Sequence, residues 1–396
     1  VLSKVFEHAI LNRFCDYFNT SDHQFGFKKN VSCSHAIYCV RNVVDHYVAN
    51  GSTVNICTVD LSKAFDKMNH YVLFIRLMER RLPLQLLNLF VLWFTTSVTC
   101  VKWGAYSSHF FRLMAGIRQG GVLSPYFFAV FVDILVSKIQ SKNIGCYIYG
   151  LCAAIFLYAD DIILLAPSIG GLQQLMQLCE AAVEEIDMKI NVSKTVCIRF
   201  GNRCNAECVS IKLNNGDQLQ WVDRCRYSGI YFAKGRTLSC LFSNAKKNFY
   251  KSFNSVYSKI GRFASEEVVL NLLNVKCMSS LLYGTEACPM FSRHKHSFDF
   301  VVTRVFMKIL CTRSATVVEE CQRYFCFLPS RYRIDIRTAR FLDRFGKTAN
   351  IICRSFYVEA RKQLRDILLK YGVTDVTKSC MLANIIHKGF VNGELK

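Results

Sequence analysis

The sequence predicts an α+β protein in which short apolar strands alternate with amphipathic helices before a basic, mostly helical C-terminal half. The run "AIFLYADDIILLA" at 154–166 is typical of two short strands joined at a tip that carries Asp160 and Asp161. Segment 172–186 has apolar residues at helical spacing. A hydrophobic content of 52% with 13% aromatic residues argues against a disordered chain.

The other elements follow in chain order. The stretch "STVNICTVDL" at 52–61 predicts a strand that leads to Asp60, and helical character follows over roughly 70–95. The glycine-rich run "GIRQGGVLSP" predicts a loop feeding a helix, with Pro125 suited to its first turn. Strand character resumes near 192–200.

One apolar segment raises the question of a membrane span. "LPLQLLNLFVLWFTTSVTCV" contains Pro83, Gln85 and Asn88, and two arginines precede it, so a buried helix is the better prediction. No membrane partner is expected.

The 20 cysteines bear on the compartment. They are scattered, often inside apolar runs, and no secretory signal is visible, which favours reduced thiols in the nucleus and cytoplasm. Cys311, Cys321 and Cys326 lack zinc-site spacing, so structural zinc is not the prediction.

The charge is strongly basic. Lys and Arg number 50 against 29 Asp and Glu, a net charge of +21. Most of this excess falls after residue 230, which indicates a nucleic-acid partner over the alternative of a merely basic soluble surface. Segment 246–262 combines one apolar stripe with lysines, which fits a helix that follows a phosphate backbone or an ordinary solvated helix.

Three carboxylates carry the chemistry. Asp60 ends one apolar strand, and Asp160 and Asp161 interrupt another apolar run, where unpaired charge is costly. If the strands are neighbours, the three acids meet at one sheet edge and form a hard oxygen site suited to two Mg²⁺ ions. A solvent-exposed turn is the alternative for the Asp160–Asp161 pair.

Four segments in order resemble motifs A to D of reverse transcriptases. They are "TVDLSKAFDKMNH" around Asp60, "GIRQGGVLSP" at 116–125, "YADD" at 158–161 and "INVSKTVCIRF" at 190–200. Their wording is similar to the non-LTR, LINE-type retrotransposon branch. The resemblance implies a right-hand polymerase with fingers, palm and thumb, an antiparallel palm sheet, a helical thumb and a helical C-terminal extension.

The resemblance also implies roles. Asp60, Asp160 and Asp161 would hold two Mg²⁺ ions, with Mn²⁺ as a substitute, and the Leu61 carbonyl is a further ligand. Lys194 matches the motif D lysine near the leaving pyrophosphate, with a surface lysine as the alternative. The remaining nucleotide-binding residues are Phe65, a gate against a 2′-hydroxyl or else a core ring, together with Gln119 and Gly120.

The implied reaction is attack by a primer 3′-hydroxyl on a dNTP, templated by RNA, with a DNA primer or target and the element's own RNA as partners. The expected domains are fingers and palm at 1–235, thumb at 236–292 and a basic extension at 293–396. The chain is expected to be a fragment that lacks an upstream endonuclease and part of the fingers. A group II intron-like maturase and a catalytically silent nucleic-acid-binding remnant are the alternative functions.

Overall fold

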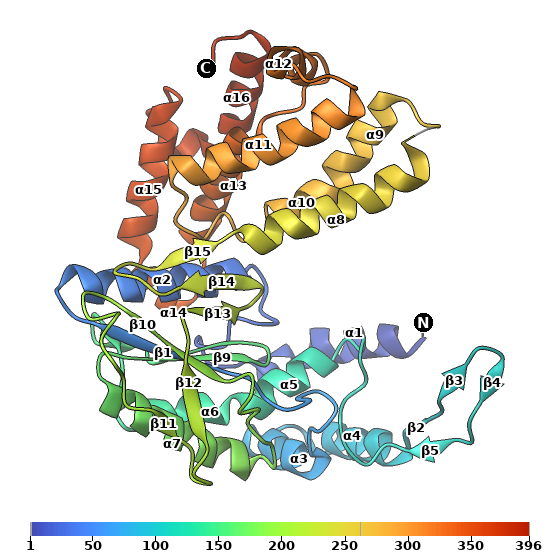
Figure 1. Ribbon diagram of the computed structural model, residues 1–396. Helices are drawn as coiled ribbons and strands as arrows, with labels where there is room; N and C mark the ends of the chain where they lie inside the picture. The colour runs from blue at the N-terminus through green and yellow to red at the C-terminus, as the bar shows by residue number, and fades with distance from the viewer. Residues whose placement is uncertain (1, 262, 396) are drawn as a thin grey trace. The chain divides into compact units, whose positions relative to one another are not determined.

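The computed structural model describes residues 2–261 and 263–395, which fall into two compact units (Figure 1). The first unit comprises the residues up to 36, 43–228 and 234–237. The second comprises 37–42, 229–233 and the residues from 238 onward. The predicted limits of fingers and palm, thumb and extension stay a prediction.

The first unit is built on a six-stranded sheet in the order β11-β12-β10-β1-β9-β8. β1 pairs with β9 and β10 antiparallel, and β8 and β9 form an antiparallel hairpin. Only the β10–β12 pairing is parallel among the pairings described for this sheet. The strands are β1 (Val54–Val59), β8 (Ile155–Tyr158), β9 (Asp161–Ala166), β10 (Val196–Phe200), β11 (Ile211–Lys212) and β12 (Gln218–Trp221).

The central strand β1 is buried along its whole length. Its sequence is therefore an almost continuous apolar run, because both of its neighbours and both faces of the sheet exclude water. The predicted strand at 52–61 and the predicted hairpin around the two aspartates are both confirmed.

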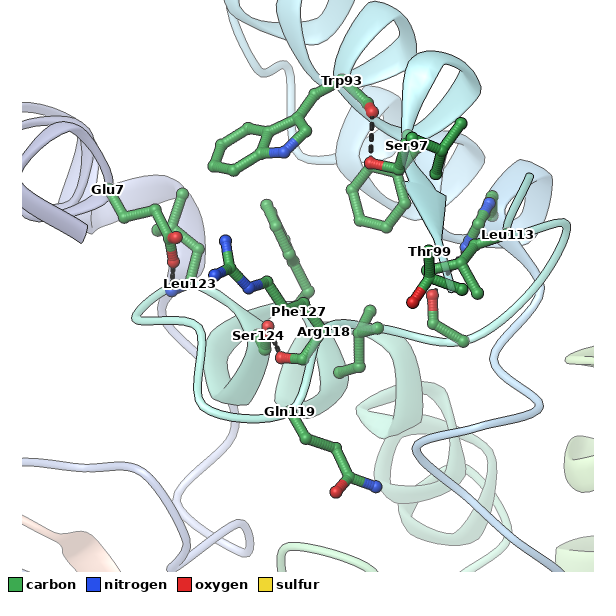
Figure 2. Close-up of a pocket in the computed structure, with 15 residues that line it drawn as sticks. Glu7, Trp93, Ser97, Thr99, Leu113, Arg118, Gln119, Leu123, Ser124 and Phe127 are labelled. Carbon is green, nitrogen blue, oxygen red and sulfur yellow. Dashed lines mark hydrogen bonds between the residues drawn. The ribbon is translucent and has the colours of Figure 1, made fainter. Parts of the chain in front are cut away.

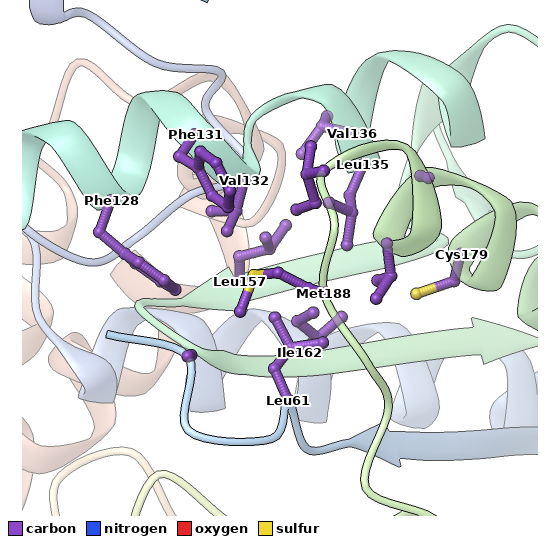
Figure 3. Packing of buried hydrophobic residues seen from close by; sticks show 14 of the residues in the cluster. Leu61, Phe128, Phe131, Val132, Leu135, Val136, Leu157, Ile162, Cys179 and Met188 are labelled. Carbon is purple, nitrogen blue, oxygen red and sulfur yellow. The ribbon is translucent and has the colours of Figure 1, made fainter. Parts of the chain in front are cut away.

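Helices cover the sheet of this unit. Figure 3 shows Phe128 and Leu135 reaching toward the strand residues Leu157 and Ile162, with Cys179 beside them. All five side chains belong to one buried apolar cluster. The helices of the unit are α1 (Leu2–Phe14), η1 (Cys15–Phe18), α2 (Cys33–Ala49, divided between the two units), α3 (His70–Glu79), α4 (Leu84–Thr96), α5 (Ser124–Val132), α6 (Ile134–Gln140) and α7 (Ile169–Glu185).

The helical stretch predicted over 70–95 is two helices, not one. α3 ends at Glu79 and α4 starts at Leu84, with Pro83 at its N-cap position. Proline cannot donate a backbone hydrogen bond and restricts the residue before it, so the chain turns between them. α4 has 13 residues. Across the described part of the chain, no helix combines the length and apolar character that crossing a bilayer requires.

Short ribbons complete the first unit. β2 pairs with β5, β3 with β4, and β6 with β7, each antiparallel. β13 comes directly after β12 in the sequence. Their bounds are β2 (Val98–Thr99), β3 (Lys102–Trp103), β4 (Tyr106–Ser107), β5 (Phe111–Arg112), β6 (Tyr147–Ile148), β7 (Leu151–Cys152) and β13 (Arg224–Tyr227).

The second unit is mostly helical, as predicted, with one antiparallel ribbon of β14 (Ile230–Ala233) and β15 (Ser239–Leu241). In α8 the predicted stripe is confirmed, because Phe249 and Phe253 are buried while Lys247 and Lys251 are exposed. The helices are α8 (Ser243–Ile260), α9 (Glu266–Leu272), η2 (Leu273–Cys277), α10 (Met278–Leu281), α11 (Ser292–Ile309), α12 (Ala315–Tyr324), α13 (Ser330–Phe345), α14 (Ile351–Ser355), α15 (Tyr357–Lys370), η3 (Val376–Met381) and α16 (Leu382–Val391).

A buried carboxylate ties three helical segments of the second unit together. Asp335 on α13 is 3% exposed and accepts hydrogen bonds from Lys295, from Lys370 Nζ at 2.7 Å and from the Tyr371 hydroxyl at 2.7 Å. Burial by itself raises the pKa of Asp335, but the hydrogen bonds from these donors outweigh it, so the pKa lies below the ordinary value.

The cysteines are free thiols throughout the described residues. Cys39, Cys57 and Cys179, predicted as core-packing thiols, are fully buried. Burial raises the pKa of the Cys179 thiol to about 12, which keeps it protonated and unreactive near neutral pH.

Candidate functional site

Strand register brings the first and last of the three aspartates together. β1 and β9 pair with Val59 opposite Ile162, and Asp60 is the next residue beyond Val59. Continuing the register by one residue sets Asp60 opposite Asp161. Directly opposed residues in an antiparallel pair have Cα atoms about 4.5–5.5 Å apart. The predicted convergence of the two strands is therefore confirmed at the level of the backbone.

Asp160 occupies the turn of the β8–β9 hairpin. Tyr158 pairs with Asp161, which leaves Ala159 and Asp160 as a two-residue turn. Ala159 has φ of 57°, in the left-handed region that costs a residue with a Cβ about 1–2 kcal/mol. Something outside the hairpin must hold this conformation.

The segment around Gln24 holds the turn. The fully buried Gln24 accepts through Oε1 from the backbone N–H groups of Ala159 at 3.1 Å and Gly26 at 2.9 Å, and Nε2 donates to the Ala159 carbonyl at 3.4 Å. Gly26 lies so close that a Cβ there would stand 2.6 Å from the Ala159 nitrogen. No motif in the sequence points to this role of Gln24.

The pKa values of both carboxylates at the hairpin tip are raised above their ordinary value. Burial and then the charge of Asp60 raise the pKa of Asp160, against a backbone hydrogen bond and Lys194, which lower it. Burial and then the charge of Asp160 raise the pKa of Asp161, although solvent reaches its side chain. Neighbouring carboxylates repel one another, and either a proton or a bound cation relieves that repulsion.

Asp161 has partners of its own. Hydrogen bonds from Ser228, through both side chain and backbone, and the charge of Arg226 act to lower its pKa. Asp161 therefore already has hydrogen-bond donors and a positive charge beside its carboxylate.

Lys194 lies at the site. Its Nζ is 3.5 Å from Asp60 Oδ2, and the two side chains are 67% and 36% exposed. The turn before β10 fixes this arrangement, because Asn191 N–H donates to the Asp60 carbonyl at 2.8 Å and Asp60 N–H donates to Thr195 Oγ1 at 3.2 Å. The Lys194 ammonium group therefore lies beside the Asp60 carboxylate, where a bound metal ion would also lie.

Leu61 and Phe65 follow Asp60 on the same loop. Leu61 pairs with Ile190 in an isolated antiparallel bridge. The two hydrogen bonds of this bridge are made by the flanking residues: the Ser62 N–H donates to the Lys189 carbonyl, and the Asp60 carbonyl accepts from the Asn191 N–H. Those bonds leave the Leu61 carbonyl uninvolved. The Phe65 ring stacks on the buried Phe128 ring, with centroids 4.3 Å apart, and is itself only partly buried. One side of the ring is core, and the role of the other stays a prediction.

Gln119 and Gly120 lie on a second loop that is tied to the first. Gly116 N–H donates to the Met68 carbonyl at 2.8 Å and Ile117 N–H donates to the Phe65 carbonyl at 2.9 Å. Gln119 Nε2 donates to Asp66 Oδ1 at 3.2 Å. Gly120 has φ of 83° and open space around it, so glycine suits its backbone conformation.

A cavity of about 590 Å³ adjoins this second loop. Figure 2 shows Trp93 and Ser97 on one side of it and Arg118 on the loop, with Gln119 turned away from them. The buried carboxylate of Glu7 accepts from the backbone N–H groups of Val122 and, at 2.9 Å, Leu123, directly before α5. Glu7 thus caps the helix that the loop feeds, a role that no local sequence pattern indicates.

No group of three or more His, Cys, Asp or Glu side chains within 2–261 and 263–395 is close enough to enclose a metal ion by itself. Mg²⁺ is commonly held by only one or two carboxylates, with waters and substrate phosphates in its other positions. The pair Asp60 and Asp160, with Asp161 beside it, fits such an open site.

Residues 1–232 match the family model described as "Reverse transcriptase (RNA-dependent DNA polymerase)". Over 247 residues the chain is 23% identical to the Pol polyprotein of the type-2 retrotransposable element R2DM of Drosophila melanogaster, covering 61% of this chain and 23% of that protein. Over 263 residues it is 25% identical to the RNA-directed DNA polymerase of the Drosophila melanogaster mobile element jockey, covering 63% and 27%. Over 186 residues it is 30% identical to the Pol polyprotein of a Nasonia vitripennis type-1 element R2, covering 45% and 18%.

The chain thus spans about a quarter of the length of these relatives. Among solved structures, it is similar to a Candida albicans telomerase in complex with a telomeric RNA fragment, with a TM-score of 0.47 and 12% identity, covering 97% of this chain and 56% of that one. It is also similar to apo telomerase from Candida tropicalis, with a TM-score of 0.45 and 12% identity, covering 98% and 60%.

Proposed function

The chain belongs to the reverse transcriptase family, and from this premise we propose that it is the RNA-directed DNA polymerase part of a LINE-type retrotransposon. The single observation that carries the proposal is the β1–β9 register, which sets Asp60 beside the hairpin that bears Asp160 and Asp161. The reaction is transfer of a nucleotide from a dNTP to a primer 3′-hydroxyl, with release of pyrophosphate.

Members of this family use divalent metal ions. The finer proposal is two Mg²⁺ ions, replaceable by Mn²⁺, held by Asp60 and Asp160 with Asp161 beside them and with the Leu61 carbonyl as a further ligand. The raised pKa values of Asp160 and Asp161 support this, because their causes include repulsion between carboxylates that a cation would relieve. Bound metal would activate the attacking hydroxyl and stabilise charge on the leaving oxygen.

The protein groups position the reactants. Gln24 fixes the turn that carries Asp160, and Thr195 fixes the backbone at Asp60. Lys194 lies beside Asp60 and, with a divalent ion held there, would turn toward the triphosphate and stabilise or protonate the leaving pyrophosphate. This general-acid role is part of the proposal.

The nucleotide lies against the two linked loops in this proposal. Phe65 presents the face of its ring that is not stacked on Phe128 to the sugar and excludes a 2′-hydroxyl. Gln119 contacts the base pair, and Gly120 allows close backbone approach. The hydrogen bond from Gln119 to Asp66 then breaks when substrate binds.

The proposed partners are an RNA template, a DNA primer or target, dNTPs and the element's own RNA. The net charge of +21 supports polyanionic partners. A reducing compartment, the nucleus and cytoplasm, is proposed from the abundance of free thiols. The palm and fingers at 1–235, thumb at 236–292 and extension at 293–396 are proposed with it.

Primer extension tests the proposal. The chain is incubated with a labelled DNA primer on an RNA template, the four dNTPs and Mg²⁺, and single-turnover extension is followed. Asp160→Asn should slow extension at least about 100-fold while template binding is kept, because a metal ligand is lost. Asp217→Asn is the matched control, since Asp217 is an exposed acid of the β11–β12 turn, and it should leave the rate unchanged.

Two outcomes would overturn the proposal. RNA binding without extension by the unaltered chain would favour the silent remnant. Equal rates for Asp160→Asn and Asp217→Asn would remove the hairpin tip from the chemistry.

A further inference from the structure

A basic pocket lies within the second unit, and the residues that line it come more than 100 positions after Asp161 in the sequence. It has a volume of about 410 Å³ and is formed by residues of η2, α10, α13 and α16, together with the segment before α13. Arg333, Arg337 and Arg340 line it from α13, and His387 lines it from α16. None of the described residues that line the pocket is acidic.

Helix geometry explains why the three arginines share the pocket. Positions 333, 337 and 340 stand at i, i+4 and i+7, which is one face of a helix. Ile336 lines the pocket between them, and the opposite face of α13 carries the buried Asp335 network. The arginine face is therefore distinct from the face that holds the unit together through Asp335.

Arg333 is a partly buried charge that lacks an acidic partner among the described residues. Its Nε donates to the Leu328 carbonyl at 2.7 Å, one Nη donates to Asn274 Oδ1, and the guanidinium lies 4.2 Å above the Phe327 ring. Burial lowers the pKa of Arg333 to about 10. Neutral acceptors and a ring orient the guanidinium but leave its charge uncompensated, which is costly unless an anion binds.

The other two arginines add charge. Arg337 Nη2 donates to Glu286 Oε2 at 3.1 Å, whereas its buried Nε has no hydrogen-bond partner in the described structure. Arg340 is exposed at the pocket. The pKa of His387 is lowered, first by burial and then by the positive charges of Arg333 and Arg340. Among the described ion pairs, only Arg337 of the three arginines has a carboxylate partner.

We propose that this pocket binds a backbone phosphate of a single-stranded nucleic acid, with Arg340 and His387 at its exposed edge and Arg333 and Arg337 deeper inside. Guanidinium groups match phosphate oxygens through paired hydrogen bonds. The exposed edge suits a chain that passes over the pocket, and the excess of basic residues in this unit suits a polyanion. The proposal rests on the proposed function for its ligand, but its tests need no catalysis.

The first test measures binding of a labelled single-stranded RNA, and of the same sequence as DNA, to the full chain over a range of salt. Arg340→Gln should weaken binding about 5-fold near 0.1 M salt and lower the slope of log K against log salt by about 0.7, the contribution of one phosphate contact. Arg365→Gln is the matched control, because Arg365 is an exposed arginine of the same unit that does not line the pocket, and its effect should stay under about 2-fold. Equal effects of the two variants would overturn the proposal.

The second test uses a native thiol. Cys326 is exposed and lines the pocket, whereas Cys311 is exposed in the same unit but does not line it. Bound oligonucleotide should slow alkylation of Cys326, followed by peptide mass spectrometry, and leave Cys311 unchanged. Unslowed Cys326, or protection by pyrophosphate but not by the oligonucleotide, would overturn the proposal. The two proposals can fail separately. If the unaltered chain does not extend a primer but the binding and alkylation results are as expected, the proposed function fails and the phosphate pocket stands.

Discussion

Replacing Gln24 by alanine should disturb the catalytic turn without touching a carboxylate. The substitution removes the acceptor for the Ala159 and Gly26 N–H groups and the donor to the Ala159 carbonyl. Two hydrogen bonds of ordinary length are worth about 1 kcal/mol each, and an N–H left buried without a partner costs about 1–3 kcal/mol. We expect the free energy of unfolding to fall by about 3–5 kcal/mol.

The same loss should slow the reaction. Without Gln24, Ala159 can leave its left-handed conformation and gain back about 1–2 kcal/mol, which moves Asp160 with it. Misplacement by about 1 Å costs about 100-fold in rate. We therefore expect single-turnover extension to slow about 10- to 100-fold in protein that is still folded.

Gln173→Ala is the matched control for this experiment. Gln173 also clamps a backbone with both ends of its amide, donating to the Lys212 carbonyl at 2.7 Å and accepting from the Lys212 N–H at 2.8 Å, but on α7 and β11. Urea unfolding followed by circular dichroism gives the stability of each variant, and primer extension gives the rate. If Gln24→Ala and Gln173→Ala lose similar stability and neither loses rate, Gln24 has no positioning role.

Three further substitutions test other parts of the structure. Gly26→Ala would set a Cβ 2.6 Å from the Ala159 nitrogen, so we expect a loss of about 1–3 kcal/mol and a slower reaction, read by the same two assays; unchanged stability would contradict the close approach. Phe65→Ala should raise incorporation of ribonucleotides relative to deoxyribonucleotides by at least about 10-fold, measured as a ratio of kcat/KM values, whereas a ring that serves only to pack on Phe128 would lower both equally. The folded pKa of Asp335 is depressed, so its contribution to stability is present above the ordinary pKa of about 4 and is lost as the pH falls through the lower folded value; Asp335→Asn should cost about 3–5 kcal/mol at pH 7 and flatten the acid side of the stability profile, and an unaltered profile in urea titrations would refute the assignment.

The sequence by itself determined the elements and the order of the chemical motifs. The apolar run before Asp60, the hairpin around Asp160 and the α8 stripe were all predictable, because strand and helix periodicity is written in residues that are neighbours in the chain. The break at Pro83 shows the limit of this reasoning, since the helical pattern on either side of the proline hid the turn. Apolar patterning thus located the carboxylates on the sheet but said little about what holds them.

Only the tertiary structure decided those supports. Gln24 binds a turn 135 residues away, Glu7 caps a helix that begins beyond residue 120, and Lys194 reaches Asp60 through a turn of another strand. Likewise, only the folded structure shows that Arg333 donates to a neutral backbone carbonyl and not to a carboxylate. A hydrogen bond or ion pair between distant segments depends on the register and packing of the whole unit, and no local pattern in the chain encodes it.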